Sequence, residues 1–260
     1  MALTVLSISS QVVYGNVGNS AAVPAIQSRG HEVLAVPTIV LSIPPDLGVP
    51  ISLRVAAPDL AAILGSLEDR GILAGCSAVM TGYFPANDQI HGVARIIKRM
   101  RERNPSLYVL VDPIIGDGDA MYVPLPVAEA IRDELLPLAN CISPNRFELA
   151  WLSGYRVTKV GEAVVAARSL GVSEVVATSI PVLPGGLATL VITSDDCFKE
   201  VSPLKPSVPH GTGDFLAGLY LAERFEHQPQ EALRRASAIL QRAIGRSVGS
   251  PVLNITEKPQ

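Results

Sequence analysis

The chain has 260 residues, of which 48% are hydrophobic, and its formal net charge is -3 at pH 7. This length suits one large α/β domain, or two small ones, with a buried core, and the small negative charge gives no electrostatic footprint for nucleic acid. No apolar stretch reaches the roughly 18 residues that a membrane-spanning helix requires, so we expect neither a membrane nor a nucleic acid as a partner.

Short β-rich runs alternate with longer helical patterns along the chain. The run Tyr108-Val-Leu-Val111 is apolar throughout, as in a strand of a parallel sheet that is buried on both faces. Alternation of this kind predicts a doubly wound α/β fold with helices on both faces of the sheet. We expect a short strand or a frayed end after Gly249. The predicted strands span 3–9, 32–37, 78–81, 107–112, 141–142, 174–178 and 188–193, and the predicted helices span 19–28, 58–70, 88–104, 124–136, 145–153 and 161–170.

Polar residues follow several of the predicted strands. Doubly wound folds bind ligands beyond the carboxyl ends of their strands, which makes these positions candidates for a site. Turns are polar in general, but five such ends at one rim of a sheet favour a functional site. They are Ser9–Gln11, Thr81–Tyr83, Asp112–Asp117, Ser143–Asn145 and Thr178–Ser179.

A glycine-rich turn, Gly211-Thr212-Gly213-Asp214, leads directly into an apolar helical run over residues 215–222. Two glycines let an anion approach the backbone closely, and the first N–H groups of a helix lack intrahelical acceptors. A carboxylate at Asp214 would repel a bound phosphate, so its useful role is to accept a proton from an attacking hydroxyl during phosphoryl transfer. The alternative interpretation is a helix cap in which Asp214 or Thr212 is the capping residue.

The segment Ser143-Pro-Asn-Arg-Phe-Glu148 suggests a metal site. Asn145 and Glu148 are three residues apart and share one face of a predicted helix, and Mg²⁺ prefers oxygen ligands and retains waters. The alternative is an ordinary first turn in which Glu148 interacts with the helix dipole. Asp112 and Asp117 bracket a Pro-Ile-Ile-Gly turn. The alternative to a functional role for these two residues is likewise a capped or hydrogen-bonded loop.

The cysteines and the basic residues carry weaker signals. Cys76, Cys141 and Cys197 lack Cys-x-x-Cys spacing, which argues against zinc and against a disulfide framework and is consistent with a reducing cytosol. We therefore expect a cytoplasmic protein. The basic residues between positions 95 and 103 suit the exposed face of a helix better than a polyanion site.

Taken together, the motifs resemble the pyridoxal kinase family of the ribokinase superfamily over roughly residues 3–245. The resemblance is specific because several independent segments occur in order and at family-like spacing. A lone Gly-Thr-Gly-Asp turn would indicate only the superfamily. The segments are Ser7–Ala22, Thr81–Tyr83, Asp112–Asp117 with Met121–Pro124, Ser143–Glu148 and Gly211–Asp214.

The resemblance implies a single ribokinase-like domain over residues 1–260, with a lid-like loop around residues 39–57, and commonly a homodimer. It also implies ATP-dependent phosphorylation of the 5′-hydroxymethyl group of pyridoxal, with pyridoxine and pyridoxamine as further candidates. By similarity Asp214 is the catalytic base, and the N–H groups of Gly211, Thr212 and Gly213 stabilise the transferred phosphoryl group.

The resemblance further assigns positions to the cofactors Mg²⁺ and K⁺ and to ATP. Asp117, Asn145 and Glu148 match Mg²⁺-side positions, and Asp112, Ser143 and Thr178 match positions around a monovalent cation. The positions that correspond to the nucleotide site are Asp117, Tyr122, Asn145, Glu148, Thr178, Ser179, Gly211, Thr212 and Gly213.

On the substrate side, Ser10 and Tyr83 match positions that contact the pyridine ring, with Val17 as an apolar wall and Asp214 at the reacting hydroxyl. A hydroxyl at Ser10 suits a hydrogen bond to the ring, and Tyr83 offers an aromatic face.

One segment departs from the family pattern. Pyridoxal kinases commonly carry a stretch like Phe-Ser-Asn-His-Thr-Gly-Tyr after the second strand, whereas this chain reads Leu41-Ser-Ile-Pro-Pro-Asp-Leu-Gly48. Pro44 and Pro45 supply neither side-chain donors nor backbone N–H groups. Two alternatives therefore stand beside pyridoxal phosphorylation: a kinase for another hydroxymethyl heterocycle such as hydroxymethylpyrimidine, and a non-catalytic vitamin B6 binder.

Overall fold

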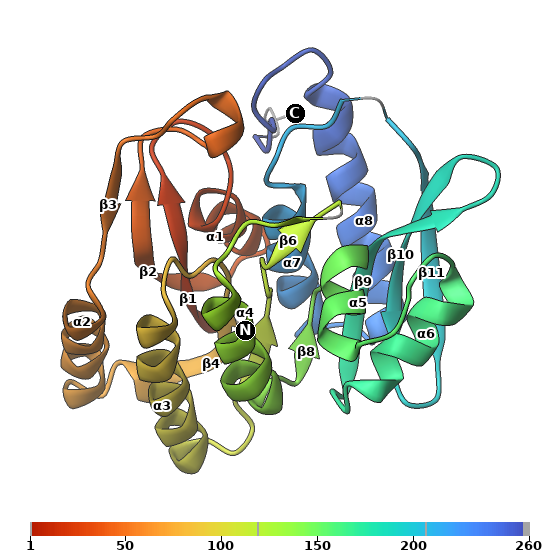
Figure 1. The fold of residues 1–260 in the computed structure, drawn as a ribbon. Helices are drawn as coiled ribbons and strands as arrows, with labels where there is room; N and C mark the ends of the chain where they lie inside the picture. The colour runs from red at the N-terminus through yellow and green to blue at the C-terminus, as the bar shows by residue number, and fades with distance from the viewer. Residues whose placement is uncertain (1, 119, 206, 257–260) are drawn as a thin grey trace.

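The chain folds around a single large β-sheet that is covered by helices on both faces, as the ribbon in Figure 1 shows. A computed structural model describes residues 2–118, 120–205 and 207–256. The predicted doubly wound α/β class is confirmed. Within the described residues, no helix is long and apolar enough to cross a membrane.

The strands of the described residues form a large sheet and a small two-stranded hairpin. Three of the predicted strands, at 3–9, 32–37 and 174–178, continue beyond their predicted ends, because polar residues near their carboxyl ends remain within the ladder. The large sheet comprises β1 (Thr4–Val12), β2 (Glu32–Leu41), β3 (Ser52–Arg54), β4 (Cys76–Thr81), β5 (Tyr108–Val111), β8 (Cys141–Ile142), β9 (Glu174–Val182), β10 (Gly186–Ile192) and β11 (Cys197–Pro203), and the hairpin pairs β6 (Gly116–Asp117) with β7 (Ala120–Met121).

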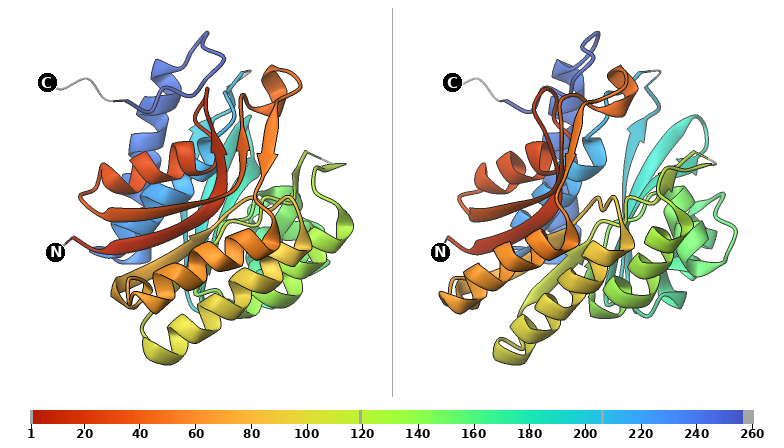
Figure 2. Two further views of the ribbon diagram at one scale, coloured as in Figure 1. Left: turned by 90° about the vertical axis from the view of Figure 1, so that its left-hand side faces the viewer. Right: turned by 60° about the vertical axis from the view of Figure 1, so that its left-hand side comes forward.

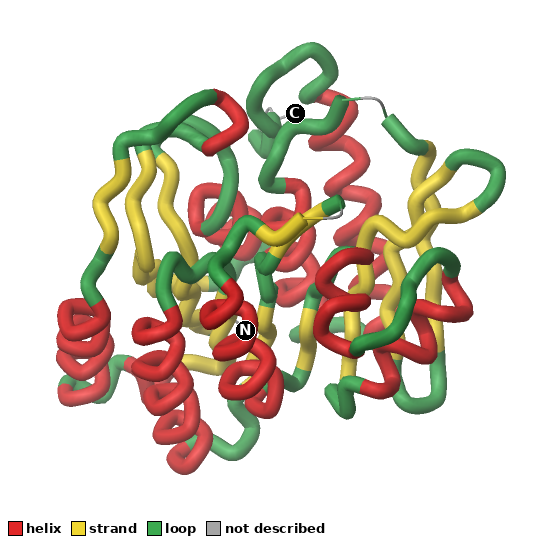
Figure 3. Tube along the Cα trace, in the orientation of Figure 1, coloured by secondary structure: helices red, strands yellow, loops and turns green. Residues whose placement is uncertain are grey.

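The order of the large sheet is β11-β10-β9-β8-β5-β4-β1-β2-β3. The strands from β2 to β9 in this order are parallel, while β3 on one side and β10 and β11 on the other run antiparallel. Parallel neighbours end at the same edge of a sheet, so the loops after β1, β4, β5 and β8 share one rim. Figure 3 shows long loops gathered at that end of the sheet.

The helices follow most of the predicted positions. The segment 124–136 differs, because its helix changes to a π-helical turn and then to a 3₁₀ turn that contains Pro137. The helices are α1 (Asn19–Gln27), α2 (Ala57–Asp69), α3 (Asn87–Arg103), α4 (Leu125–Ala130), α5 (Arg146–Ser153), α6 (Val160–Ser169), α7 (Thr212–Arg224) and α8 (Pro229–Arg246), with the shorter turns η1 (Pro45–Leu47), η2 (Leu73–Gly75), η3 (Ile131–Leu135) and η4 (Leu136–Leu138).

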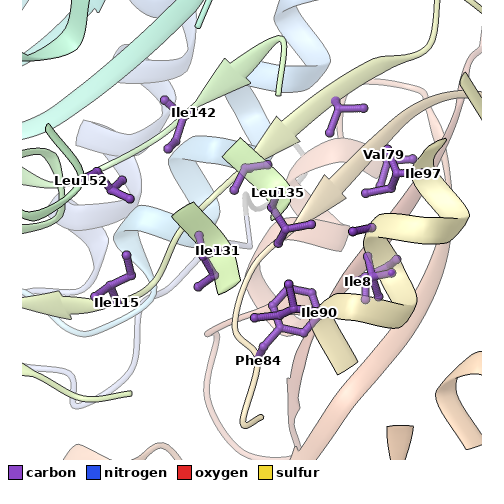
Figure 4. Packing of buried hydrophobic residues seen from close by; sticks show 14 of the residues in the cluster. Ile8, Val79, Phe84, Ile90, Ile97, Ile115, Ile131, Leu135, Ile142 and Leu152 are labelled. Carbon is purple, nitrogen blue, oxygen red and sulfur yellow. The ribbon is translucent and has the colours of Figure 1, made fainter. Parts of the chain in front are cut away.

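The helices divide between the two faces of the sheet, which Figure 2 shows from two further directions. α2 to α6 pack on one face, where Ile8, Val79 and Ile97 belong to a large apolar cluster (Figure 4). α1, α7 and α8 pack on the other face, around Tyr220 and Leu233. The buried face of α7 fixes this helix against the sheet, so its N-terminus is held at the rim where the strands end.

The lid (residues 39–57) contains the end of β2, the turn η1 and the short edge strand β3. Its base is fixed from α3, since Gln89 Nε2 donates to the carbonyls of Thr38 and Val55 at 3.0 and 2.6 Å. A strand within this loop was not predicted, because the three residues of β3 are all exposed and show no apolar alternation.

The segment after Gly249 is neither a strand nor frayed over its described residues. Leu253 is fully buried, and its carbonyl accepts a hydrogen bond of 2.7 Å from Asn16 Nδ2. The expectation for this tail is therefore wrong over residues 250–256: burial of one leucine and a side-chain hydrogen bond hold it against the loop after β1.

Candidate active site

The predicted site residues gather at the rim where the parallel strands end. Ser10 lies near the end of β1, Asp112 directly after β5, and Ser143 directly after β8. Thr178 joins them from β9, since it bridges to Asn145 and its N–H donates to the carbonyl of Pro144 at 2.9 Å. Segments that are far apart in the sequence thus form one polar surface.

The glycine turn forms the N-terminus of α7. Gly211 is the N-cap residue and has a left-handed backbone with φ 94°. A Cβ atom at this position would lie 1.7 Å from the carbonyl oxygen of Asn16, so only glycine fits. Thr212 and Gly213 occupy the first two helical positions, where backbone N–H groups lack intrahelical acceptors. The capping alternative does not hold at the cap itself, because Gly211 occupies that position rather than Thr212 or Asp214.

Asp214 lies in the first turn of α7 and is partly buried. Burial raises its pKa to about 6, and the backbone N–H groups of Gly18 and of Asp214 itself lie close enough to oppose that rise. The charge of His210 likewise lowers this pKa. A carboxylate with a pKa near 6 is ionised at neutral pH and is basic enough to accept a proton.

Gly18 was not singled out from the sequence, although it receives a specific role here. Its φ is 57°, and a Cβ atom on it would lie 2.3 Å from Ser10 Oγ. Only glycine therefore allows its N–H to point at Asp214 while Ser10 lies beside it. The available signal was the pair of glycines, Gly15 and Gly18, directly after the first predicted strand.

Asp112 belongs to a buried group of carboxylates. Its side chain is buried, and this burial, followed by the charges of Asp214 and Glu148, raises its pKa well above the ordinary value. The Ser143 hydroxyl lies close enough to oppose that rise. Among the described residues, however, the buried oxygens Ser143 Oγ and Thr81 Oγ1 have no hydrogen-bond partner within normal distance and angle. Unpartnered hydroxyls beside a buried carboxylate fit a monovalent cation.

Asn145 and Glu148 form a capping box at the start of α5. Asn145 Oδ1 accepts from the Glu148 N–H at 3.0 Å, and Glu148 Oε2 accepts from the Asn145 N–H at 2.9 Å. Glu148 Oε1 also accepts from the Ile115 N–H at 2.8 Å, and burial raises the pKa of this carboxyl to about 7. The ordinary first turn is thus present. Because its hydrogen bonds already occupy the side-chain oxygens of Asn145 and Glu148, these oxygens would contact a metal only through water.

Asp117 and Tyr122 lie beside this capping box. Asp117 is exposed at the end of β6, and Gly116 just before it accepts a hydrogen bond of 2.7 Å from Asn145 Nδ2. Partial desolvation and the nearby carboxylates of Glu148 and Asp117 raise the pKa of Tyr122. In the described residues, no group of three or more His, Cys, Asp or Glu side chains is arranged to hold a metal directly. The oxygen donors of Asp117, Asn145 and Glu148 are of the type that Mg²⁺ prefers.

Thr178 and Ser179 lie at an irregularity of β9. The pairing of β10 with β9 shifts between Ala188 and Leu190, opposite these two residues. Ser179 has a positive φ of 59°, which is rare for a residue with a side chain. Bulges turn side chains out of the regular alternation of a strand and are common beside active sites.

The predicted substrate residues line the opposite side of the glycine turn. Ser10 is buried next to Gly18, and the Val17 side chain lies 3.1 Å from the position that a Cβ atom on Gly211 would take. Tyr83 is half-buried, and its backbone is held by Ser9 Oγ at 3.1 Å and by Thr38 Oγ1 at 2.7 Å. These contacts fix the backbone of Tyr83 and leave the role of its ring as a prediction.

Comparisons with known proteins identify relatives of this chain. A family model described as phosphomethylpyrimidine kinase matches residues 68–252. The pyridoxine/pyridoxal/pyridoxamine kinase of Bordetella avium is 38% identical over 92% of this chain and 80% of its own length. A pyridoxal kinase of Granulibacter bethesdensis is 34% identical over 91% of this chain and 87% of its own length.

Solved structures show the same similarity. The crystal structure of pyridoxal kinase from Entamoeba histolytica superposes with a TM-score of 0.91 at 30% identity, covering 98% of this chain and 93% of its own. Pyridoxal kinase from Leishmania donovani, solved in complex with ADP and pyridoxine, has a TM-score of 0.88 at 29% identity, covering 97% of this chain and 90% of its own.

Proposed function

Because this chain belongs to the pyridoxal kinase family of the ribokinase superfamily, we propose that it phosphorylates pyridoxal, with pyridoxine and pyridoxamine as further substrates. The γ-phosphoryl group of ATP is transferred to the 5′-hydroxymethyl oxygen, which yields pyridoxal 5′-phosphate and ADP. The observation that carries this proposal is the partly buried carboxylate of Asp214, with a pKa of about 6, at the open N-terminus of α7.

In the proposed reaction Asp214 accepts the proton of the attacking hydroxyl while the new O–P bond forms and the bond between the γ-phosphorus and the β-phosphate oxygen breaks. The N–H groups of Gly211, Thr212 and Gly213 stabilise negative charge on the transferred phosphoryl oxygens. The N–H of Gly18 keeps the Asp214 carboxylate oriented. The chain thus supplies position and charge stabilisation, and it forms no covalent intermediate.

Two cations fit the acidic rim. Asp117, Asn145 and Glu148 would hold Mg²⁺ through its water shell, and Asp112, Ser143 and Thr178 would hold a monovalent cation such as K⁺. When bound, the cations neutralise charge on the ATP phosphates. The unpartnered Ser143 hydroxyl supports this assignment, and so do the carboxyl pKa values raised by burial. Thr178, Ser179 and Tyr122 complete the proposed nucleotide side of the site.

The proposed substrate side consists of Ser10, Val17 and Tyr83, with the lid above them. Ser10 offers a hydroxyl to the pyridine ring, Val17 an apolar wall and Tyr83 an aromatic face. The described lid places Pro44 against Gly15, where Pro44 is buried. A lid of this composition excludes water without adding side-chain hydrogen bonds to the substrate.

The second candidate is phosphorylation of a hydroxymethylpyrimidine, and the description of the matched family model favours it. ADP release with pyridoxal, pyridoxine, pyridoxamine and hydroxymethylpyrimidine, each at saturating ATP and with Asp214→Asn as the control, separates the candidates. We expect the highest kcat/KM with a B6 vitamer. A higher kcat/KM with hydroxymethylpyrimidine would assign the second candidate. Tight pyridoxal binding without turnover of any compound would assign a vitamin B6 binder.

We also propose that residues 1–260 act as a single cytoplasmic domain that forms a homodimer. The free cysteines support a reducing compartment. Val49, Ile51 and Leu53 are 97%, 82% and 70% exposed on the lid, next to the edge strand β3, and an exposed apolar edge favours association. Light scattering should give the mass of two chains. Ile51→Glu should give one chain, and a monomeric wild type would contradict the dimer.

A further inference from the structure

The lid meets the catalytic glycine turn through a short loop that both of them contact. The lid runs beside the segment after β1, since the N–H groups of Val13 and Tyr14 donate to the carbonyls of Leu41 and Ser42 at 2.8 and 3.1 Å. Figure 1 shows the lid and the described segment 247–256 at the same end of the molecule. The lid is therefore anchored along its first part, and its tip lies over the loop 13–18.

The tip of the lid packs closely against the loop 13–18. A Cβ atom at Gly15, whose φ is 112°, would lie 2.9 Å from Pro44 Cγ and 3.3 Å from Val252 Cγ1. The next residue, Asn16, has its carbonyl oxygen against Gly211 and its side chain on Leu253. Close packing thus runs without interruption from Pro44 through Gly15 and Asn16 to the first residue of the glycine turn.

A second connection joins the lid directly to the turn. Asp46, in the lid turn η1, places Oδ2 at 3.8 Å from Nε2 of His210, the residue before Gly211. The side chains are 29% and 67% exposed, so the pair adds little to overall stability. The pair instead affects the position of the lid relative to the glycine turn, because Asp46 lies in the lid and His210 directly precedes Gly211. The charge of His210 also acts on Asp214, whose pKa it lowers.

We propose that Asp46 and His210 are positioning residues that hold the lid closed against the glycine turn. Closure over the substrate and alignment of the N–H groups at Gly211, Thr212 and Gly213 then occur together. The contact between Asp46 and His210 joins the tip of the lid to the residue before the glycine turn. This proposal rests on the proposed kinase activity for its kinetic consequences, and on the geometry of the free protein for its conformational ones.

The test is a double-mutant cycle on the full chain with Asp46→Asn, His210→Gln and the double variant. Asp59→Asn, on an exposed residue at the start of α2, is the matched control. We expect each single change to raise KM for pyridoxal roughly 2- to 5-fold, with kcat nearly unchanged at pH 8, well above the Asp214 pKa of about 6, and the double variant to be no worse than either single variant. Asp46→Glu, which keeps the carboxylate, should retain the wild-type KM. Single effects that multiply in the double variant would overturn the proposal.

Hydrogen exchange in the free protein separates this proposal from the proposed function. The amides of Leu47 and Gly48 donate within the lid turn, at 3.1 and 3.3 Å to the carbonyls of Pro44 and Pro45. They should exchange faster in Asp46→Asn and His210→Gln than in wild type and in Asp59→Asn. Unchanged exchange would overturn the proposed positioning role of Asp46 and His210 even if the enzyme phosphorylates pyridoxal. A wild type without turnover would remove the function and leave this exchange test valid.

Discussion

The backbone N–H of Gly18 lies close enough to the carboxylate of Asp214 to lower its pKa, which brings the loop after the first strand to the N-terminus of α7. Gly18 adopts φ 57° with Ser10 Oγ directly beside it. We predict that Gly18→Ala lowers kcat at least 10-fold, because a Cβ atom moves this N–H away from Asp214 and displaces Ser10, a loss of about 1.4 kcal/mol or more in transition-state stabilisation. Steady-state kinetics check this, with Gly30→Ala as a control at another left-handed glycine that has open space around it. Equal kcat in both variants would contradict the role of Gly18.

The two glycines of the catalytic turn should respond differently to alanine. At Gly211, φ is 94° and the added Cβ atom meets the Asn16 carbonyl, so Gly211→Ala should lower the free energy of unfolding by about 1–3 kcal/mol or more. At Gly213 no atom lies within 4 Å of the added Cβ, so Gly213→Ala should keep wild-type stability. Turnover should still fall in Gly213→Ala, because the methyl group enters the space proposed for the phosphoryl group. Urea unfolding and kinetics on both variants test this contrast, and full activity in Gly213→Ala would contradict the anion site.

The ionised carboxylate of Asp214 should reduce stability at neutral pH. Burial raises its pKa from 3.8 to about 6, so between these values the folded state holds the proton more tightly than the unfolded state does. Stability contributed by this group is therefore highest below pH ~4 and falls as the pH rises through about 6. Asp214→Asn should raise Tm at pH 8, by roughly 2–4 °C for each kcal/mol recovered, and the gain should shrink at pH 4. A Tm gain that is equal at both values would show that titration of Asp214 is not its cause.

The capping box at Asn145 and Glu148 should serve both stability and nucleotide binding. Asn145→Ala removes the acceptor for the Glu148 N–H and should lower the free energy of unfolding by about 0.5–2 kcal/mol. Asn145→Asp keeps the cap, so it should retain stability. If these residues also meet Mg²⁺ through water, Asn145→Ala should raise KM for the Mg²⁺–ATP complex while Asn145→Asp does not. An unchanged KM in a destabilised Asn145→Ala would leave the cap as the only role of Asn145.

The sequence indicates the fold class well because buried parallel strands have a strong local signature. Tyr108–Val111 is apolar throughout and forms β5 at the centre of the sheet, next to β4 and β8. The edge strand β3 has no such signature, because its three residues are exposed and only backbone pairing with β2 defines it. The tail at Leu253 is missed for a similar reason: Leu253 is buried in an apolar cluster with residues of α1, α7 and α8, and its carbonyl bonds Asn16, which is distant in sequence.

The predicted site residues occupy one rim because their motifs follow strands that the sequence identifies. Gly18 and His210 could not be found in this way. The role of Gly18 arises from the approach of α7 to the first loop, and that of His210 from the approach of the lid to the turn. Neither contact joins sequence neighbours, so the sequence pattern alone gives neither role, although the glycine pair Gly15 and Gly18 after the first strand was a local signal. Asn145 and Glu148 show a different limit of sequence-based prediction. Their three-residue spacing predicts a capping box and a metal site equally well.

In the proposed reaction, Asp214 acts as the general base of phosphoryl transfer. The most direct measurement is kcat for ADP formation with pyridoxal in Asp214→Ala, compared with wild type and with Asp59→Ala at an exposed position. We predict a loss on the order of 10²- to 10⁴-fold in Asp214→Ala, unchanged ATP affinity, and wild-type turnover in Asp59→Ala. A kcat near the wild-type value in Asp214→Ala would contradict the account.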